Sequence, residues 1–272
     1  MNHGMVGANV PLFWRDPALP FIEARLVRDG RQVCYAKHWH ETFSVGLIDA
    51  GRCKYLNNGR TEEVSAGTVV LMNPGDAHAC NPIHGEPWSY RMLYVDTSWL
   101  GEVGAAAGGK NGFAPFATTA TSRADVYHGL NQLFAVLIDP RADRLEKQFA
   151  TVSFMELLQL RLENGSTDST RAPRVARAAD FIRRNCALSL NLKDICLETG
   201  LSASHLIRAF KEAYGLTPHA YQLNCRIELC RSGLRAGRSI AEVALAAGFA
   251  DQAHFQRTFK RFVAATPGQY RA

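Results

Sequence analysis

The chain has 272 residues, of which 47% are hydrophobic and 21% charged, a composition that excludes disordered and fibrous proteins and leaves room for two domains. Its longest apolar run, residues 133–138, is far shorter than the about 20 residues of a membrane-spanning helix, so we expect no membrane association. Seven cysteines without a C-x-x-C pair, and no secretory signal, favour a cytoplasmic protein with reduced thiols.

The first part of the chain is predicted to be mainly β-structure. Residues 1–20 contain several prolines and are predicted to form an N-terminal arm. From residue 21 to about residue 100, short β-like runs alternate with turn signals, which is typical of a small β-barrel or sandwich. His38 and His40 lie two residues apart in one such run and should therefore share a face of the sheet.

Residues 125–162 contain two amphipathic helical patterns, which are separated at Asp139-Pro140. Apolar residues recur at helical spacing on both sides of this break, at Val126, Leu130, Leu133, Phe134 and Leu137 and at Leu145, Phe149, Val152, Met155 and Leu158. Such a helical pair covers the β-structure or forms a contact between two copies of the chain.

A run of small polar residues at 164–173 predicts a flexible linker between two parts of opposite charge. Residues 1–170 contain 15 Lys and Arg against 18 Asp and Glu, whereas residues 171–272 contain 16 against 7. The C-terminal part is therefore the candidate for binding a polyanion such as DNA.

The basic C-terminal part contains an internal repeat. Residues 192–200 align with 240–248, and residues 205–221 align with 254–270 after one inserted residue. Each copy has a short helical pattern, a glycine and a second helical pattern, which predicts a helix-turn-helix unit whose second helix enters the DNA major groove. Residues 218–235 keep helical register between the copies and predict a stiff connecting helix of about 25 Å.

The exposed face of each second helix carries side chains that suit DNA. Arginine can bind a guanine edge, glutamine an adenine edge and isoleucine a thymine methyl group, while cations near the helix ends suit phosphates. Ordinary solvent-facing polar residues are the alternative interpretation. We predict base readout by Ser204, Ile207, Arg208, Gln252, Gln256 and Arg257, and phosphate contacts by Lys211, Lys260 and Arg261.

Residues 174–272 resemble the DNA-binding domain of the AraC/XylS family of bacterial transcription regulators. The resemblance rests on Ser202-Ala-Ser-His-Leu-Ile-Arg-Ala-Phe-Lys211 with Gly215-Leu-Thr-Pro218, and on residues 239–261 followed by Thr266-Pro-Gly-Gln-Tyr-Arg271. The chain departs from the family pattern at Ala264, where glycine is usual, and at Cys196, where alanine is usual.

Residues 34–97 resemble, more loosely, the cupin-like sensor domain that precedes this DNA-binding domain in the family. The resemblance implies an α+β fold, with a cupin-like β-barrel and helical pair at 21–163 followed by an all-α domain of two helix-turn-helix units at 174–272. It also implies a small-molecule effector site lined by His38, His40, His78 and Tyr90.

The same histidines, with Glu41, are similar to the ligand set of cupin metalloenzymes. A purely structural role for the histidines is a further alternative. Because the spacing around His78 departs from the metal-binding cupin pattern, we expect no metal ligand and no cofactor.

The two resemblances together imply a transcription regulator, and by family habit an activator, rather than an enzyme. The implied partners are double-stranded promoter DNA, a small-molecule effector and RNA polymerase, with a homodimer formed through residues 125–162. Two alternatives stay open. One is a metal-dependent cupin enzyme that carries a DNA-binding domain, and the other is a constitutive DNA-binding protein whose barrel is only structural.

Overall fold

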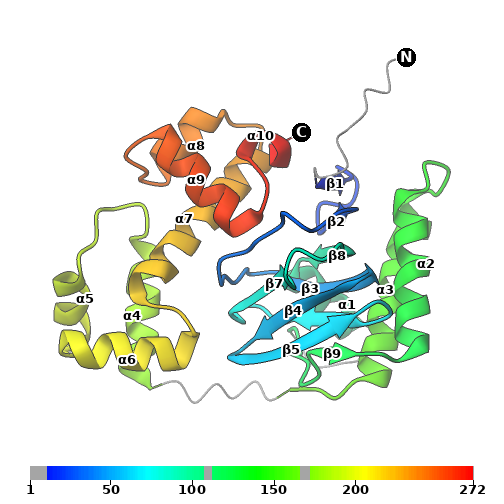
Figure 1. Cartoon of the computed structure of the whole chain (residues 1–272), viewed down its shortest axis with the longest axis horizontal. Helices are drawn as coiled ribbons and strands as arrows, with labels where there is room; N and C mark the ends of the chain where they lie inside the picture. Colours follow the sequence, from blue (N-terminus) through cyan, green and yellow to red (C-terminus); the bar gives the residue numbers. More distant parts are fainter. Residues whose placement is uncertain (1–10, 107–111, 166–171, 272) are drawn as a thin grey trace.

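The computed structural model describes residues 11–106, 112–165 and 172–271. An N-terminal part built on β-sheets and a C-terminal helical part lie side by side (Figure 1). Much of the predicted arm and most of the predicted linker lie outside the described residues. Within the described ranges, no helix has the combination of length and hydropathy needed to cross a membrane.

The strands of the N-terminal part form two antiparallel sheets. The larger sheet has the order β1 (Leu12–Arg15), β2 (Ile22–Val27), β8 (Ser89–Val95), β3 (Phe43–Ala50), β6 (Val69–Met72) and β9 (Ala120–Thr121). The smaller sheet has the order β5 (Arg60–Ser65), β4 (Arg52–Asn57) and β7 (His78–Pro82). The predicted α+β fold with a β-barrel or sandwich is therefore confirmed. Strand β1 falls within the predicted arm, so the described end of that arm is part of the sheet.

Strand β3 lies in the interior of the larger sheet and is buried on both faces over residues 43–48. Val45 and Leu47 face the helices, whereas Ile48 packs between the two sheets with Trp88 and Met92. Side chains alternate along a strand, so β3 contributes to two separate cores.

Three helices complete the N-terminal part: α1 (Thr97–Ala106), α2 (Ala124–Ile138) and α3 (Arg144–Arg161). Helix α2 buries all five predicted apolar positions. Helix α3 differs from the prediction, because Leu145 and Phe149 are 73% and 72% exposed while Thr151 and Phe154 are buried. The predicted apolar stripe thus mixes two faces of α3, one packed on the core and one exposed.

The C-terminal part contains the predicted repeat. Its helices are α4 (Pro173–Arg184), α5 (Leu192–Thr199), α6 (Ala203–Tyr214), α7 (Pro218–Arg235), α8 (Ile240–Ala246), α9 (Gln252–Val263) and α10 (Pro267–Arg271). The pairs α5–α6 and α8–α9 are the two helix-turn-helix units, and α7 connects them. At about 1.5 Å per residue, the 18 residues of α7 span about 27 Å.

Local sequence signals explain where the second helices begin. The side chain of Ser202 accepts a hydrogen bond from the backbone N–H of His205, and Asp251 accepts one from His254, as expected of N-caps. Gly200 ends α5 in the left-handed conformation, with φ of +66°. Each second helix then packs its apolar face into its own hydrophobic cluster.

The two parts of the molecule also pack directly against each other. The backbone N–H of Trp39 donates to Asn224 Oδ1 at 3.0 Å, and Asn224 Nδ2 donates to the Trp39 carbonyl at 2.8 Å. The Trp39 ring lies 5.1 Å from that of Tyr221 and is buried in the cluster formed by α4–α7. Helix α7 therefore faces the N-terminal part along its side (Figure 1).

Candidate nucleic-acid interface and ligand cavity

The predicted base-reading residues of α6 lie together on its solvent side. Ser204, Ile207 and Arg208 are exposed, whereas Leu206 and Phe210 on the opposite side are fully buried. The side chains that anchor the helix and those that could read bases are thus on different faces, as the helical spacing predicts.

Helix α9 has the same arrangement. Gln252, Gln256 and Arg257 are exposed, while Phe255 and Phe259 are fully buried. The three predicted phosphate-contact residues, also exposed, are Lys211, Lys260 and Arg261.

The cations of this surface are not neutralised by neighbouring carboxylates. Within the described part of the chain, none of the nine predicted DNA-contact side chains has an ion pair, and five of them are cationic: Arg208, Lys211, Arg257, Lys260 and Arg261. Exposed, unpaired cations are what a phosphate backbone attracts. Contact of each residue with DNA stays a prediction.

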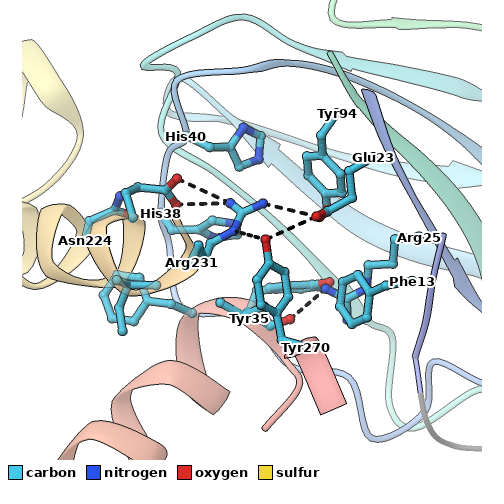
Figure 2. Close-up of a pocket in the computed structure, with 14 residues that line it drawn as sticks. Phe13, Glu23, Arg25, Tyr35, His38, His40, Tyr94, Asn224, Arg231 and Tyr270 are labelled. Carbon is cyan, nitrogen blue, oxygen red and sulfur yellow. Dashed lines mark hydrogen bonds and ion pairs between the residues drawn. The ribbon is translucent and has the colours of Figure 1, made fainter. Parts of the chain in front are cut away.

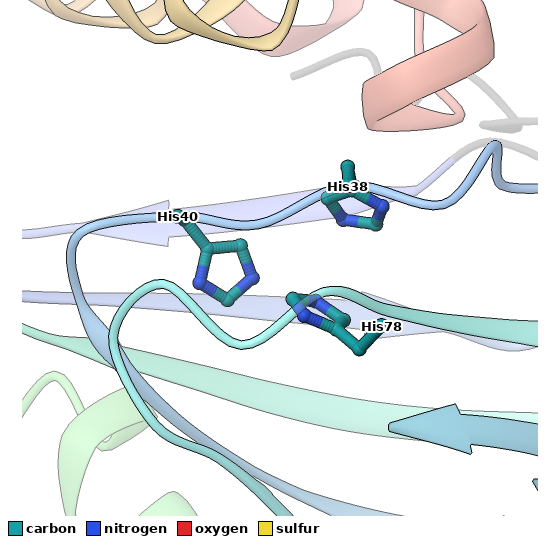
Figure 3. A group of neighbouring side chains, drawn as sticks. All are labelled: His38, His40 and His78. Atoms are coloured by element: carbon teal, nitrogen blue, oxygen red, sulfur yellow. The ribbon is translucent and has the colours of Figure 1, made fainter. Parts of the chain in front are cut away.

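The three predicted histidines meet where the segment before β3 passes β7 (Figure 3). His38 and His78 exchange two backbone hydrogen bonds, of 3.0 Å and 2.8 Å, in an isolated bridge. One ring nitrogen from each of His38, His40 and His78 lies within 4.8 Å of the other two. The shared face of His38 and His40 is therefore as predicted, although the predicted strand shortens to this bridge.

Backbone carbonyl groups fix the orientation of two of these rings. His38 Nδ1 donates to the Ala36 carbonyl at 2.8 Å, and His78 Nδ1 donates to the Asp76 carbonyl at 2.7 Å. Burial lowers the pKa of His38 and His40 well below the usual value, and it lowers the pKa of His78 to about 4. All three rings are therefore neutral near pH 7, with Nε2 of His38 and His78 available as an acceptor.

Two cavities adjoin this cluster. One lies within the β-structure, and its apolar walls include Ile48, Met72, Trp88 and Met92. All four predicted effector residues, His38, His40, His78 and Tyr90, line this cavity. The structure thus brings them together, while their contact with an effector stays a prediction.

The second cavity lies between the N-terminal and C-terminal parts (Figure 2). It shares four wall residues with the first cavity: Tyr35, His38, His40 and Tyr94. Its other walls come from β1 and β2 on one side and from α7, α9 and α10 on the other.

A buried charge network forms part of this wall. Arg231 of α7 lies 3.1 Å from Glu228 and 3.6 Å from Glu23 of β2, and Glu23 also pairs with Arg15 at 2.7 Å. Burial acts to raise the pKa of Glu23, but Arg231 and Arg15 outweigh it and hold that pKa below the usual value. Tyr270 of α10 donates to Glu23 at 3.2 Å, so one carboxylate joins three elements of the fold.

Arg25 lies in the same wall and was not among the predicted site residues. Its Nη1 donates to the carbonyl of Val263 at 2.6 Å, and its Nη2 lies 3.5 Å from that of Ala264. A signal did exist, because a strand that is otherwise apolar carries two charged residues, Glu23 and Arg25, two positions apart on one face. Local pattern could not show that this face meets α9, more than 230 residues away in sequence.

Comparisons with known proteins agree with this architecture. A family model described as an AraC-like ligand binding domain matches residues 22–158, and a helix-turn-helix domain model matches residues 195–272. A helix-turn-helix transcriptional regulator of Bacillus subtilis is 27% identical over 224 residues, which cover 81% of each chain. The arabinose operon regulatory protein of Escherichia coli is 26% identical over 245 residues, covering 85% of this chain and 80% of that protein.

Solved structures show the same fold at low sequence identity. ToxT from Vibrio cholerae superposes with a TM-score of 0.56 at 13% identity, covering 96% of this chain and 95% of that chain. A ToxT structure with a bound unsaturated fatty acid also gives a TM-score of 0.56, at 15% identity, covering 96% and 92%.

Proposed function

The chain belongs to the AraC family of transcriptional regulators, with a ligand-binding domain followed by a helix-turn-helix DNA-binding domain, and we propose that a small molecule in the paired cavities controls the DNA contacts of α6 and α9. The observation that supports this proposal best is the wall between the two parts, to which β2, α7 and α10 all contribute. An occupant of that space contacts both parts, so its affinity depends on their arrangement, and binding shifts the population of arrangements.

Promoter binding in the presence of candidate metabolites tests this proposal. We expect one metabolite class to raise the melting temperature and to change the affinity for a promoter fragment by at least fivefold. A protein that prefers one promoter fragment, but whose stability and affinity no metabolite changes, would instead be a constitutive DNA-binding protein.

We propose that the base contacts and the phosphate contacts are made by the residues that the sequence predicts for each. Exposure, common faces and unpaired charge support base readout by α6 and α9, with phosphate contacts at their C-terminal ends. The proposed domain bounds are 21–163 and 174–272, and the proposed place of action is the cytoplasm. Activation through RNA polymerase is tested by transcription in vitro, where a higher transcript yield supports it and a lower yield indicates repression.

The proposed homodimer uses the exposed face of α3. Leu145, Phe149 and Leu160 are each more than 70% exposed, and Ile138 at the end of α2 is 60% exposed. Apolar side chains gathered on one helix are typical of a protein interface. We expect Phe149→Ser to shift a dimer toward monomer in sedimentation velocity, and an unchanged sedimentation coefficient would place the interface elsewhere.

The histidine cluster favours one alternative, a metal-dependent cupin enzyme with a DNA-binding domain. Three neutral imidazoles within 4.8 Å, two of them oriented by carbonyl groups, match the ligands and supporting hydrogen bonds of zinc and iron sites. Elemental analysis separates the functions: stoichiometric metal that is lost in His40→Ala supports the enzyme, whereas substoichiometric metal in both proteins supports the organic effector.

A further inference from the structure

Two cysteine side chains meet where the chain leaves α4 and packs against α7. The carbonyl group of Cys186 accepts a hydrogen bond of 3.2 Å from Gln222 Nε2 and one of 2.7 Å from Arg226 Nε. Cys225 lies three residues after Gln222 on α7 and therefore shares the side of the helix that contacts Cys186. Both cysteines belong to the buried hydrophobic cluster of the first helix-turn-helix unit, so their thiol groups are neighbours.

The surroundings of Cys186 favour its thiolate form. The Cys225 thiol donates a hydrogen bond to the Cys186 sulfur, and this contact lowers the pKa of Cys186. Burial opposes that shift, while Arg226 and the backbone N–H groups of residues 186 and 187 add to it. The same contact and burial raise the pKa of Cys225, which stays a thiol. A thiolate beside a thiol reacts with peroxides and can then close a disulfide.

The loop that carries Cys186 runs along the surface of the molecule. Asn185 and Ala187 are partly exposed, and Leu188 is 59% exposed. Cys186 itself is 4% exposed, so it lies just beneath this surface. A small local opening of the loop is therefore enough to admit an oxidant about the size of a water molecule, such as hydrogen peroxide.

A second pair of neighbouring cysteines lacks these features and provides an internal comparison. Cys53 of β4 and Cys80 of β7 lie on adjacent strands of the smaller sheet, and their side chains share a hydrogen bond. The contact with Cys53 and burial both raise the pKa of Cys80 well above its usual value. Because Cys53 is fully buried and the Cys80 thiol stays protonated, we expect this pair to resist oxidation.

We propose that Cys186 and Cys225 form a reversible oxidation site, at which hydrogen peroxide converts the two thiols to a disulfide. The Cys186 thiolate attacks one peroxide oxygen, the O–O bond breaks, and the leaving hydroxide takes up a proton to become water. The Cys225 sulfur then attacks the sulfenic acid of Cys186, the S–O bond breaks, and the hydroxyl group leaves as water with the Cys225 proton. The two sulfurs lose two electrons, which reduce one peroxide to two water molecules.

The site lies where the two helix-turn-helix units touch, beside the connecting helix α7 (Figure 1). Arg226 Nη1 donates to the carbonyl of Gly248, in the turn of the second unit, at 2.7 Å, and Nη2 donates to that of Leu188 at 2.9 Å. The Gly248 backbone packs so closely on Ala187 that a Cβ atom there would lie 1.9 Å from the Ala187 carbonyl oxygen. A disulfide brings its sulfurs to about 2 Å, closer than hydrogen-bonded thiols, so the loop 186–188 shifts and the spacing of α6 and α9 changes.

Peptide mapping under non-reducing conditions tests the site on the full-length, reduced protein. After treatment with a small molar excess of hydrogen peroxide, we expect a disulfide between Cys186 and Cys225 that dithiothreitol reverses. Cys53 and Cys80 should remain free thiols in the same sample. Fluorescence anisotropy with a promoter fragment that the reduced protein prefers should show at least a fivefold loss of affinity on oxidation, and dithiothreitol should restore it.

Two variants and a control assign the roles of the two sulfurs. Cys186→Ser should form no disulfide and should keep its promoter affinity after peroxide treatment. Cys225→Ser should stop at the sulfenic acid of Cys186, which dimedone labels. Cys196→Ser removes a partly exposed thiol of α5, in the same unit, and should respond to peroxide like the unaltered protein. Mapping of the unaltered protein tests the site even where a variant does not fold.

Several results would overturn the proposal. Recovery of Cys186 as a free thiol, or its linkage to Cys230 instead of Cys225, contradicts the site, and so does faster oxidation of the pair in the smaller sheet. A disulfide between Cys186 and Cys225 that leaves promoter affinity unchanged overturns its control of DNA binding. The proposed control by a small molecule is judged separately, because peptide mapping and its DNA assay require no effector.

Discussion

Cations serve opposite purposes in the two functional regions of this molecule. On α6 and α9 the cations are exposed and unpaired. They keep their hydration in the free protein, so they destabilise it little and remain available to phosphates and bases. In the wall between the two parts, Arg231 and Arg15 are withdrawn from most of the solvent and held by carboxylates. Charge removal should therefore weaken DNA binding in the first region and the folded state in the second.

The largest effect is expected in the buried network. Arg231→Ala leaves Glu23 and Glu228 without their shared partner, which should lower the free energy of unfolding by about 3–5 kcal/mol. Urea denaturation followed by circular dichroism measures this loss. Arg174→Ala removes an exposed arginine of α4 that has no ion pair among the described residues, and it should change stability by less than about 0.5 kcal/mol. Similar losses in both variants would contradict the contrast between the regions.

A second effect concerns pH. The pKa of His78 is about 4 in the folded protein and near 6.5 when exposed, so the unfolded chain takes up the proton first. Stability is complete above pH 6.5 and falls as the pH drops toward 4, by about 3 kcal/mol from this histidine. Urea denaturation at several pH values in the presence of a chelator measures the slope. His78→Asn should reduce the slope between pH 6.5 and pH 4 without abolishing it, because burial also lowers the pKa of His38 and His40, and an unchanged slope would remove His78 as one of its sources.

The DNA-reading surface should respond in binding rather than in stability. Arg208→Ala is expected to lower the binding free energy by about 1–3 kcal/mol and to relax the sequence preference at one base position. Lys260→Ala should weaken binding to all DNA sequences alike and reduce the slope of log affinity against log salt concentration by about 1. Fluorescence anisotropy with a promoter fragment and single-base variants distinguishes the two. If both variants give the same pattern, the assignment of base and phosphate contacts is wrong.

The smallest effect tests the junction of the two regions. Ala264 ends α9 in the left-handed conformation, with φ of +50°. In this conformation the Cβ atom crowds the backbone, which raises the free energy of any residue other than glycine. Ala264→Gly should raise the free energy of unfolding by about 1 kcal/mol. Ala236→Gly at the end of α7, where φ is −75°, should give no such gain in the same denaturation measurement. A gain at both positions would mean that conformation at residue 264 is not the cause.

Features that depend on neighbouring residues were predictable from the sequence. The repeat, the N-caps Ser202 and Asp251 and the connecting helix 218–235 follow from periodicity and capping chemistry, and all are present. The common face of His38 and His40 was also predictable. Such features depend on residues that are close in sequence, so they can be recognised from one amino-acid sequence alone.

Features that depend on distant segments were not predictable. The roles of Arg25 and Arg231 depend on β2 meeting α7 and α9, and no local pattern encodes that meeting. Helix α3 illustrates the same limit, since its apolar residues fit one periodic stripe although Leu145 and Phe149 are exposed. Periodicity identifies an amphipathic helix, but the choice between two neighbouring faces is made by tertiary packing.

The amide of Asn224 satisfies both backbone groups of Trp39, as a neighbouring strand would. Separation of the two parts breaks both hydrogen bonds at once and brings the indole, now 4% exposed, into water. Its fluorescence emission should then move to longer wavelength. The protein thus carries an intrinsic optical reporter of domain opening, which could follow the kinetics of opening without an added label.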